Sequence, residues 1–301
     1  MRLRHIEVVN AIRVTGTTSA AAELLNLTQP GVSQILQSAE LQLGYALFTR
    51  SKGRLIPTHE ALALFPQIER LEQQLDAVRQ LADNLKKPRD DTLHILAAPA
   101  LALTIVPDAV LALNKKFPGI RITVRSDYSA AATTSLALQE ADVGILYHSL
   151  SHPAIQEQTI GMSELVLIGQ PTTLLRQASI GLDELGKFSL VGPDAADPVG
   201  KLLTQALTSQ NIELNLRMTA QSYHSVVALV ERSDSVGIVD AATAITARER
   251  GLTVIAIRPG ISIPIVASMA AGGKESVVSR YFIAACKSVI SSTMNSQATN
   301  T

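Results

Sequence analysis

Short polar side chains gather on one face of a helix that the sequence predicts from about Thr28 to Leu43. Thr28 can cap this helix, and Pro30 suits its first turn, where a missing N–H costs nothing. Apolar residues recur at spacings of three, four and seven from Val32 onward and take the inner face. The outward face carries donors and acceptors that suit base edges in the major groove and nearby phosphates. Its residues are Gln29, Pro30, Ser33, Gln34, Gln37 and Ser38.

Three cations follow this helix in the stretch "FTRSKGRLIPT". Short extended runs flank Lys52 and Gly53, which predicts a hairpin, or wing, whose cations meet a phosphate backbone. Residues 1–58 hold six Lys and Arg against three Glu, a net charge of +3, whereas the whole chain is neutral. A structural module with a solvated polar face would explain the helices alone, but the basic wing favours DNA. The predicted DNA-contacting residues are Ser19, Thr28, Gln29, Pro30, Ser33, Gln34, Gln37, Arg50, Lys52 and Arg54.

Two earlier helices must position this outward face. The first has an apolar stripe from Leu3 and stops at Gly16, a residue type that tolerates the backbone angles of a helix end. The second follows Thr17, a suitable cap, and runs to Leu25, after which comes the turn "NLTQ". Two helices joined by so short a turn predict a helix-turn-helix. We therefore assign residues 1–58 to a winged helix-turn-helix.

The next segment, from Thr58 to Leu85, reads as one amphipathic helix of about 27 residues, or roughly 40 Å. A helix of that length needs a partner to bury its apolar stripe. Pro66 should bend it or relax one hydrogen bond. The charged stretch "KKPRDD" after it reads as a linker, so residues 59–91 form a dimerisation helix and hinge. The predicted dimerisation residues are Leu64, Ile68, Leu71, Leu75 and Val78.

Residues 92–292 alternate short apolar strands with helical stretches. This rhythm predicts a mainly parallel sheet, or two of them, covered by helices. About 200 residues is generous for one sheet, so two lobes with a cleft between them fit better. The polar tail, residues 293–301, is predicted to be disordered.

From Leu3 to Ala61 the sequence resembles the N-terminal domain of LysR-type transcriptional regulators. The matching positions occur in order and without gaps, and the length and order of wing, linker helix and α/β lobes also match. The "LRHIE" start and the wing are most similar to regulators of amino-acid and opine metabolism. Two positions depart from the family pattern: Thr18 replaces a bulky apolar residue and Ser38 a frequent basic one. The matching residues are Ala21, Ala22, Leu25, Gln29, Pro30, Ser33, Glu40, Leu43, Gly44, Leu47, Phe48, Arg50, Pro57, Thr58 and Ala61.

The resemblance implies an α/β fold class: an N-terminal winged helix-turn-helix, a long linker helix and a C-terminal two-lobed effector domain that resembles periplasmic binding proteins. It implies a homodimer or homotetramer paired through the long helix. Two recognition helices would then read an inverted repeat in promoter DNA, with half-site centres about 34 Å apart or a multiple of that. A ligand in the cleft would change how the dimers sit on DNA. RNA polymerase is a further expected partner; no cofactor, metal or membrane is expected.

Open α/β sheets bind ligands at the carboxyl ends of their strands, and this locates the predicted cleft. Helix N-termini at such ends suit a carboxylate, so an amino acid or small organic acid is the leading ligand class. The family often has Ser or Thr where Ala100 stands. The predicted effector-binding residues are Pro99, Ala100, Tyr128, Ser129, Tyr147, His148, Asp194, Ser222 and Tyr223.

Several of these residues have simpler explanations. Ser129 is at least as well explained as a helix cap, and His148 as a surface residue. Tyr128 and Tyr223 could be edges of the core. Two aspartates outside the predicted set also stand at turns: Asp240 caps a helix or faces the cleft, and Asp197, before Pro198, starts a helix.

The sequence thus predicts a bacterial sequence-specific DNA-binding transcriptional regulator under the control of a small molecule. The alternative is a cytosolic small-molecule-binding protein or an enzyme with an appended helical module. No GxGxxG, GxxxxGK[ST] or G-x-S-x-G motif is present, and no catalytic residue is predicted. The single cysteine, Cys286, lies in an apolar stretch and reads as a buried thiol rather than a reactive one. The start "MRLRHIEVVN" lacks the apolar core of a secretory signal, so we expect a cytoplasmic protein.

Overall fold

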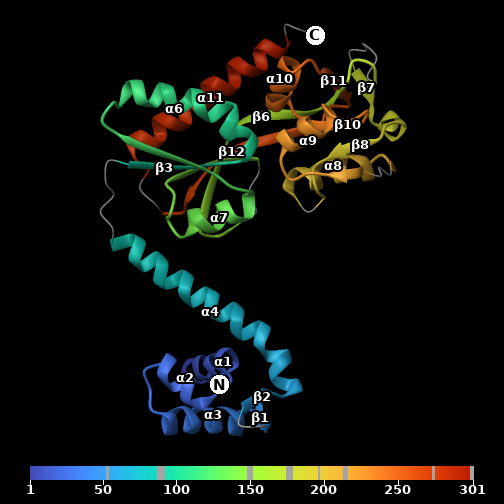
Figure 1. Ribbon diagram of the computed structural model, residues 1–301. Coiled ribbons are helices and arrows are strands. Elements are labelled where there is room, and N and C mark those ends of the chain that lie inside the picture. Colours follow the sequence, from blue (N-terminus) through green and yellow to red (C-terminus); the bar gives the residue numbers. More distant parts are fainter. Residues whose placement is uncertain are drawn as a thin grey trace. The chain divides into compact units, whose positions relative to one another are not determined.

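The computed structural model describes residues 1–51, 54–86, 92–147, 152–173, 179–195, 197–212, 216–272 and 275–298. Lys52 and His148 lie outside these ranges, and the side chain of Ser129 is not described. The chain separates into two units, Met1–Asp83 and Asn84–Thr301, and each is considered by itself (Figure 1). None of the described helices is long and apolar enough to cross a membrane.

The first unit begins with three helices, α1 (Leu3–Thr15), α2 (Thr18–Leu24) and α3 (Gln29–Leu43). The predicted terminators and caps are present. Gly16 and Gly44 end α1 and α3 with φ of 74° and 81°, in the left-handed region that glycine tolerates. The side chains of Thr17 and Thr28 accept hydrogen bonds from backbone N–H groups in the first turns of α2 and α3. Strands β1 (Phe48–Ser51) and β2 (Arg54–Pro57) then pair antiparallel, and α4 (His59–Lys86) follows.

The start of α4 belongs to the core of the first unit. Phe65 packs against Phe48 of β1 with ring centroids 6.1 Å apart. Ile68 is only 2% exposed and lies in the same cluster as Val8 and Leu36. The prediction that Ile68 faces a partner helix is therefore wrong, because its side chain is already buried within the N-terminal headpiece, which consists of α1, α2, α3, β1, β2 and the start of α4. Pro66 lies inside α4, as the sequence indicates.

The second unit contains two lobes that each carry three parallel strands. In lobe one, β3 (Thr92–Ala97) lies between β4 (Arg121–Ser126) and β5 (Val143–Tyr147), with helices α5 (Pro99–Leu103), α6 (Ile105–Lys116) and α7 (Ser129–Ala137). In lobe two, β8 (Leu190–Gly192) lies between β9 (Leu216–Thr219) and β10 (Val236–Asp240), with helices α8 (Pro198–Thr208), α9 (Tyr223–Val230) and α10 (Ala241–Glu249). Lobe two also contains β7 (Ser179–Gly181), the short helix η1 (Leu182–Lys187) and β11 (Thr253–Arg258).

One long strand, β6 (Ile155–Gly169), runs through both lobes. Its first part pairs antiparallel with β12 (Ser262–Ala270), which also pairs with β5, and its last part pairs with β10 and β11. The beginning of β6, "IQEQT", lacks strand-like alternation of apolar residues, so the sequence pattern does not indicate this part of the strand. The lobes are therefore joined by antiparallel strands, whereas the predicted sheet was mainly parallel.

The last helix, α11 (Val277–Ala298), packs against α6 and β6. It continues to Ala298, so a disordered tail from residue 293 is not what the described residues show; no glycine or proline interrupts this stretch. Cys286 is fully buried in α11, and burial raises the pKa of its thiol to about 12. Such a thiol stays protonated at neutral pH, in keeping with a packing role.

Candidate functional site

The outward face of α3 is held in place at its first residue. Gln29 Nε2 donates hydrogen bonds to Thr18 Oγ1 at 3.2 Å and Ser33 Oγ at 3.0 Å. The Thr18 hydroxyl thus links α2 to α3 at a position where a bulky apolar residue was expected. Farther along the face, Gln34 and Gln37 are exposed. The first turn of this face also exposes Thr28 and Pro30, and α2 exposes Ser19.

The wing is a tight hairpin pinned to α3. Ser51 faces Arg54 across the strands, so two residues connect them, and both Arg50 and Arg54 are exposed. Glu40 Oε1, near the end of α3, accepts hydrogen bonds from the N–H groups of Leu47 at 2.7 Å and Phe48 at 3.2 Å. The carboxylate therefore fixes where the hairpin leaves the helix, and with it the distance from the arginines to the polar face.

A polar contact links α1 to α4 within the first unit. The Asn10 side chain donates to the Glu72 carboxylate, and Arg13 Nε donates to Asn10 Oδ1 at 2.7 Å. Burial raises the pKa of Glu72, and the Arg13 charge opposes that shift. On either side of Glu72 in α4, Leu71 and Leu75 are half-buried, and Val78, farther along, is exposed. Of the predicted dimerisation residues, these three remain accessible, whereas Leu64 packs partly on the headpiece core with Ile68.

A pocket in the second unit lies where the carboxyl ends of strands from both lobes meet. Its volume is about 40 Å³. One water occupies roughly 10–15 Å³ by the same measure, so the pocket has room for about three. The predicted residues among its walls come from both lobes. The lining residues are Ala98, Pro99, Ala100, Tyr128, Tyr147, Pro193, Asp197, Val199, Gln221, Ser222 and Tyr223.

Tyr147 and Asp240 connect the lobes behind this pocket. Tyr147, the last residue of β5, donates its hydroxyl hydrogen to Asp240 Oδ2 at 2.6 Å. Asp240, the last residue of β10, also accepts from the N–H groups of Ala242 and Thr243 and so caps α10. Burial raises the pKa of Asp240, and these hydrogen bonds oppose the shift. Of the two roles left open for Asp240, capping is the one that the structure describes.

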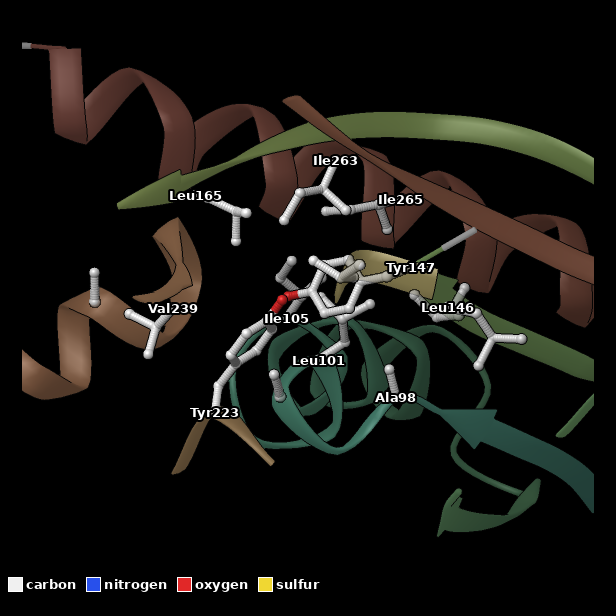
Figure 2. Close-up of a cluster of buried hydrophobic side chains, with 14 of the residues drawn as sticks. Ala98, Leu101, Ile105, Leu146, Tyr147, Leu165, Tyr223, Val239, Ile263 and Ile265 are labelled. Atoms are coloured by element: carbon white, nitrogen blue, oxygen red, sulfur yellow. The ribbon is translucent and has the colours of Figure 1, made fainter. Parts of the chain in front are cut away.

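Tyr223, at the start of α9, stands edge-to-face against Tyr147 with ring centroids 6.2 Å apart (Figure 2). The two hydroxyls approach each other in that view, surrounded by apolar side chains such as Leu101 and Ile263. Tyr223 is 8% exposed, and within the described part of the chain its hydroxyl has no hydrogen-bond partner. Buried polar groups are nearly always paired, so this hydroxyl calls for an explanation.

Asp197 is the charged residue of the pocket wall that the predicted set omitted. Its Oδ1 accepts a hydrogen bond from Val199 N at 2.9 Å and caps α8. Burial raises the pKa of Asp197, and backbone N–H groups of Val199 and Gly200 oppose the shift. Asp194, which was predicted to bind effector, is exposed and is not among the lining residues. The Asp-Pro pair marked Asp197 as a cap, and a cap at a strand end can also face a ligand.

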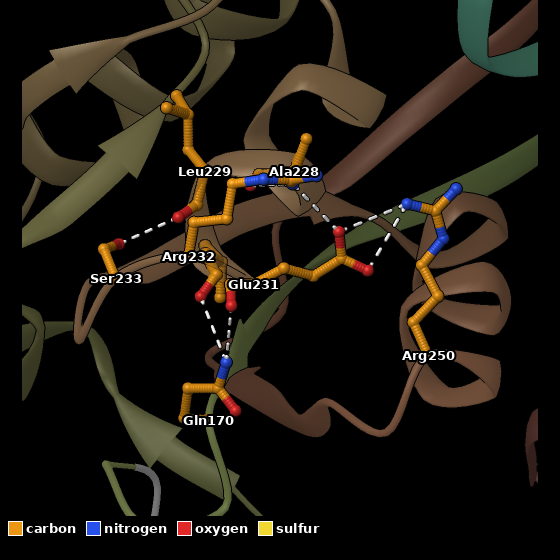
Figure 3. A network of polar contacts seen from close by, with 8 residues as sticks. Gln170, Ala228, Leu229, Glu231, Arg232, Ser233 and Arg250 are labelled. Carbon is orange, nitrogen blue, oxygen red and sulfur yellow. Dashed lines mark hydrogen bonds and ion pairs between the residues drawn. The ribbon is translucent and has the colours of Figure 1, made fainter.

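The far end of α9 is fixed by a surface network (Figure 3). Gln170 Nε2 donates to the carbonyl oxygens of Val230 at 3.4 Å and Glu231 at 3.1 Å, at the C-terminal end of the helix. The Glu231 carboxylate accepts from Arg250, just after α10, at 3.3 Å. These contacts hold α9 while its first residue, Tyr223, faces the pocket.

Comparisons with known proteins cover both units. A family model described as "Bacterial regulatory helix-turn-helix protein, lysR family" matches residues 3–62, and one described as "LysR substrate binding domain" matches residues 86–291. The HTH-type transcriptional regulator DgcR of Pseudoalteromonas sp is 34% identical over 246 residues, which cover 81% of this chain and 84% of that protein.

Two further comparisons extend over nearly the full length. The octopine catabolism/uptake operon regulatory protein OccR of Rhizobium meliloti is 26% identical over 286 residues, which cover 93% of this chain and 94% of that protein. The crystal structure of full-length CbnR complexed with its target DNA matches with a TM-score of 0.56 and 18% identity, covering 96% of this chain and all of that one. The last likeness shows the fold.

Proposed function

The chain belongs to the LysR family of DNA-binding transcriptional regulators, and from this premise we propose how its residues read DNA and sense an effector. Members of the family are regulators and not enzymes, so the alternative of an enzyme with an appended helical module is set aside. The two matched regions correspond to the DNA-binding and effector-binding domains of the family. The DNA contacts therefore belong to the first unit and the effector contacts to the second.

One observation carries the assignment of the reading face: the exposed polar row on α3 lies in the same rigid headpiece as the two exposed wing arginines. The first half of α3 enters the major groove, and Gln34 and Gln37 reach base edges. Gln29 has both amide hydrogens directed at hydroxyls, which leaves its amide oxygen to accept from an amino group of adenine or cytosine.

Arg50 and Arg54 contact phosphates on the flanking backbone, together with Ser19, Thr28, Ser33 and, outside the described residues, Lys52. The test is the salt dependence of affinity for a selected duplex. Each lost phosphate contact should lower the slope of log affinity against log salt by about 0.9. Arg54→Gln should show this reduction on every sequence, whereas Gln34→Ala should relax base preference at an unchanged slope. An unchanged slope for Arg54→Gln would contradict the phosphate assignment.

Two copies pair through α4, using Leu71, Leu75 and Val78, and present two α3 helices to an inverted repeat. These side chains are supported by their accessibility: Val78 is exposed, Leu71 and Leu75 are half-buried, and none of the three belongs to the hydrophobic core of the headpiece. Half-site centres are then about 34 Å apart or a multiple of that. Hydroxyl-radical footprinting on a selected promoter should show two protected half-sites with that spacing.

The effector binds in the pocket between the lobes. One observation supports this: residues at or just after the carboxyl ends of β3, β4 and β5 in lobe one and of β8 and β9 in lobe two line it together. The leading class is an amino acid or small organic acid, and the name of OccR, a regulator of an octopine catabolism/uptake operon, agrees with that class. Binding that favours one arrangement of the lobes would change DNA affinity by the ratio of its affinities for the two arrangements.

A regulator of bacterial promoters acts where the DNA is, so we place the protein in the cytoplasm. RNA polymerase is the further partner that such a regulator would recruit or exclude. Co-purification of polymerase with the promoter-bound protein, compared with the promoter alone, tests that partnership.

A further inference from the structure

We infer that the pocket between the lobes selects a small zwitterionic α-amino acid, with the carboxylate at the start of α9 and the ammonium at Asp197. This inference rests on the proposed effector site and narrows its ligand class. Three features of the wall lead to it: a helix start without a side-chain cap, a buried hydroxyl without a partner among the described residues, and a carboxylate with no cation beside it in the described lining.

The start of α9 is available to an anion. Its N-cap residue, Ser222, makes no side-chain capping hydrogen bond, and both Ser222 and Tyr223 line the pocket. The N–H groups of a helix's first turn have no partners within the helix and carry partial positive charge. From lobe one, α7 starts in the same way, with Tyr128 at its N-cap and no side-chain bond. A carboxylate between the lobes could therefore be bound without an Arg or Lys.

The Tyr223 hydroxyl is a second and independent sign of a ligand. It is buried and unpaired among the described residues, and it belongs to the pocket wall. Its neighbour Tyr147 has used its own hydroxyl on Asp240, so the two rings are not equivalent. A phenol hydroxyl can donate to a carboxylate at 2.5–2.7 Å. The ligand's carboxylate is the acceptor that none of the described residues provides.

Asp197 makes a simple organic acid a poor match. It is the one ionisable carboxylate in the described lining, which includes no Lys, Arg or His. A second carboxylate brought next to it would be repelled, whereas an ammonium group would be attracted. Burial alone already raises the pKa of Asp197, and a bound cation would restore its charge. A ligand with an ammonium and a carboxylate on the same carbon atom satisfies the helix start and Asp197 together.

The size of the pocket limits the side chain of this ligand. At about 40 Å³, the space suits an amino acid such as glycine, alanine or serine. A longer side chain would require the lobes to move apart, because the walls come from both of them. The inference therefore favours small amino acids over opines and aromatic acids.

The experiment is calorimetric titration of the full-length protein with matched probes. The panel contains glycine and both enantiomers of alanine and serine, the hydroxy acids lactate and glycerate, and the amines ethylamine and ethanolamine. At least one amino acid should bind the unchanged protein, and its matched hydroxy acid and amine should bind about tenfold more weakly or worse.

Three variants separate the roles. Asp197→Asn keeps the oxygen that caps α8 and removes the charge. It should therefore lower the affinity for the amino acid about tenfold and leave the affinity for the hydroxy acid nearly unchanged. Tyr223→Phe should weaken both acids while the melting temperature of the free protein stays the same or rises. Asp194→Asn, in the same turn but outside the lining, is the control and should bind like the unchanged protein.

Equal binding of the hydroxy acid and the amino acid would overturn the inference, as would an Asp197→Asn variant with unaltered preference. Failure of every probe to bind would overturn it too. Any of these three results leaves effector-controlled DNA binding standing if another small molecule shifts the affinity for promoter DNA. If no metabolite extract shifts that affinity, the proposed effector function fails as well.

Discussion

The reading face on α3 exposes Gln34 and Gln37 to solvent, whereas the cleft of the second unit buries Tyr147, Tyr223 and Asp240. An exposed amide costs no folding free energy in the DNA-free protein, because water provides its hydrogen-bond partners. A buried hydroxyl must be paired or it costs about 1–3 kcal/mol. The comparison predicts that substitutions on the α3 face leave folding stability nearly unaltered, whereas substitutions among the buried polar groups of the cleft can alter stability as well as effector binding.

The largest effect is expected from a variant that prevents two copies from pairing, so that the two α3 faces no longer act together, while the cleft is unchanged. Leu71→Glu combined with Leu75→Glu places charges where α4 would meet its partner, and light scattering should detect monomers. Affinity for an inverted repeat should fall about a hundredfold or more, because the second half-site no longer binds intramolecularly. Ligand affinity should not change.

A second pair of substitutions to Glu, on the same helix, is the control for that variant. Gln73→Glu and Gln74→Glu add equal charge at exposed positions of α4 and should leave the oligomer intact. If the leucine variant remains a dimer with full DNA affinity, α4 is not the pairing helix.

The next effect compares the same substitution, Tyr to Phe, at the two edge-to-face rings of the cleft. Tyr147→Phe removes the hydrogen bond to Asp240 and should lower the free energy of unfolding by about 1–2 kcal/mol. Tyr223→Phe removes a buried hydroxyl that has no partner among the described residues and should leave the stability of the free protein unchanged or raise it. Calorimetry of the ligand-free chain distinguishes the two. Equal losses would mean that Tyr223 has an acceptor in the free protein.

Alkaline pH should lower the free energy of unfolding of the second unit and leave that of the headpiece nearly unchanged. Burial, reinforced by the Asp240 charge, raises the pKa of Tyr147 and Tyr223 well above their usual value of 10. The unfolded chain ionises these groups near pH 10 while the folded chain keeps the protons, so their stabilising contribution is complete below pH 10 and declines above it. Each group should contribute a slope of up to about 1.4 kcal/mol per pH unit.

Urea titrations between pH 9 and 11 measure that slope. Replacing both cleft tyrosines with Phe should flatten the decline of the second unit, while Tyr45→Phe, on the exposed surface of the first unit, should not. A stability that stays level through pH 11 in the unchanged protein would contradict the burial argument.

The smallest expected effect lies in the headpiece. Thr18→Val removes an acceptor of Gln29, so the amide can turn and present a donor as well as an acceptor. Discrimination between bases at the contacted position should change by about 0.5–1.5 kcal/mol, with thermal stability nearly unaltered. Competition binding with single-base variants of one half-site is the measurement. Unchanged preference would mean that Thr18 does not orient Gln29.

The N-terminal elements were predictable because their signals are local. Gly16, Gly44, Thr17 and Thr28 act within one turn of themselves, so their positions in the sequence determined the ends of α1, α2 and α3. Ile68 was misassigned for the opposite reason. Helical spacing shows that a side chain is apolar on one face, but it does not show whether that face packs on the same chain or on a partner.

The cleft was only partly predictable. Strand ends indicated Pro99, Tyr128 and Tyr223, which do line one pocket, although their binding of effector stays a prediction. Two features could not be predicted: Asp197 lies in the pocket wall, and the Tyr147 hydroxyl bonds to Asp240 of the other lobe. Both depend on how β5, β8 and β10 are arranged in space. The polar beginning of β6 likewise has no periodic signal in the sequence. It forms a strand because it pairs with β12, more than a hundred residues later in the chain.

The central claim is that the headpiece reads sequence through its exposed face while the pocket between the lobes controls it. The most direct measurement compares the affinity of the assembled, full-length protein for a promoter selected from its own genome with that for a scrambled duplex of equal length, at one salt concentration. We predict a ratio of about a thousandfold or more, lowered toward one by Gln34→Ala with Gln37→Ala. Equal affinity for the two duplexes would contradict the account.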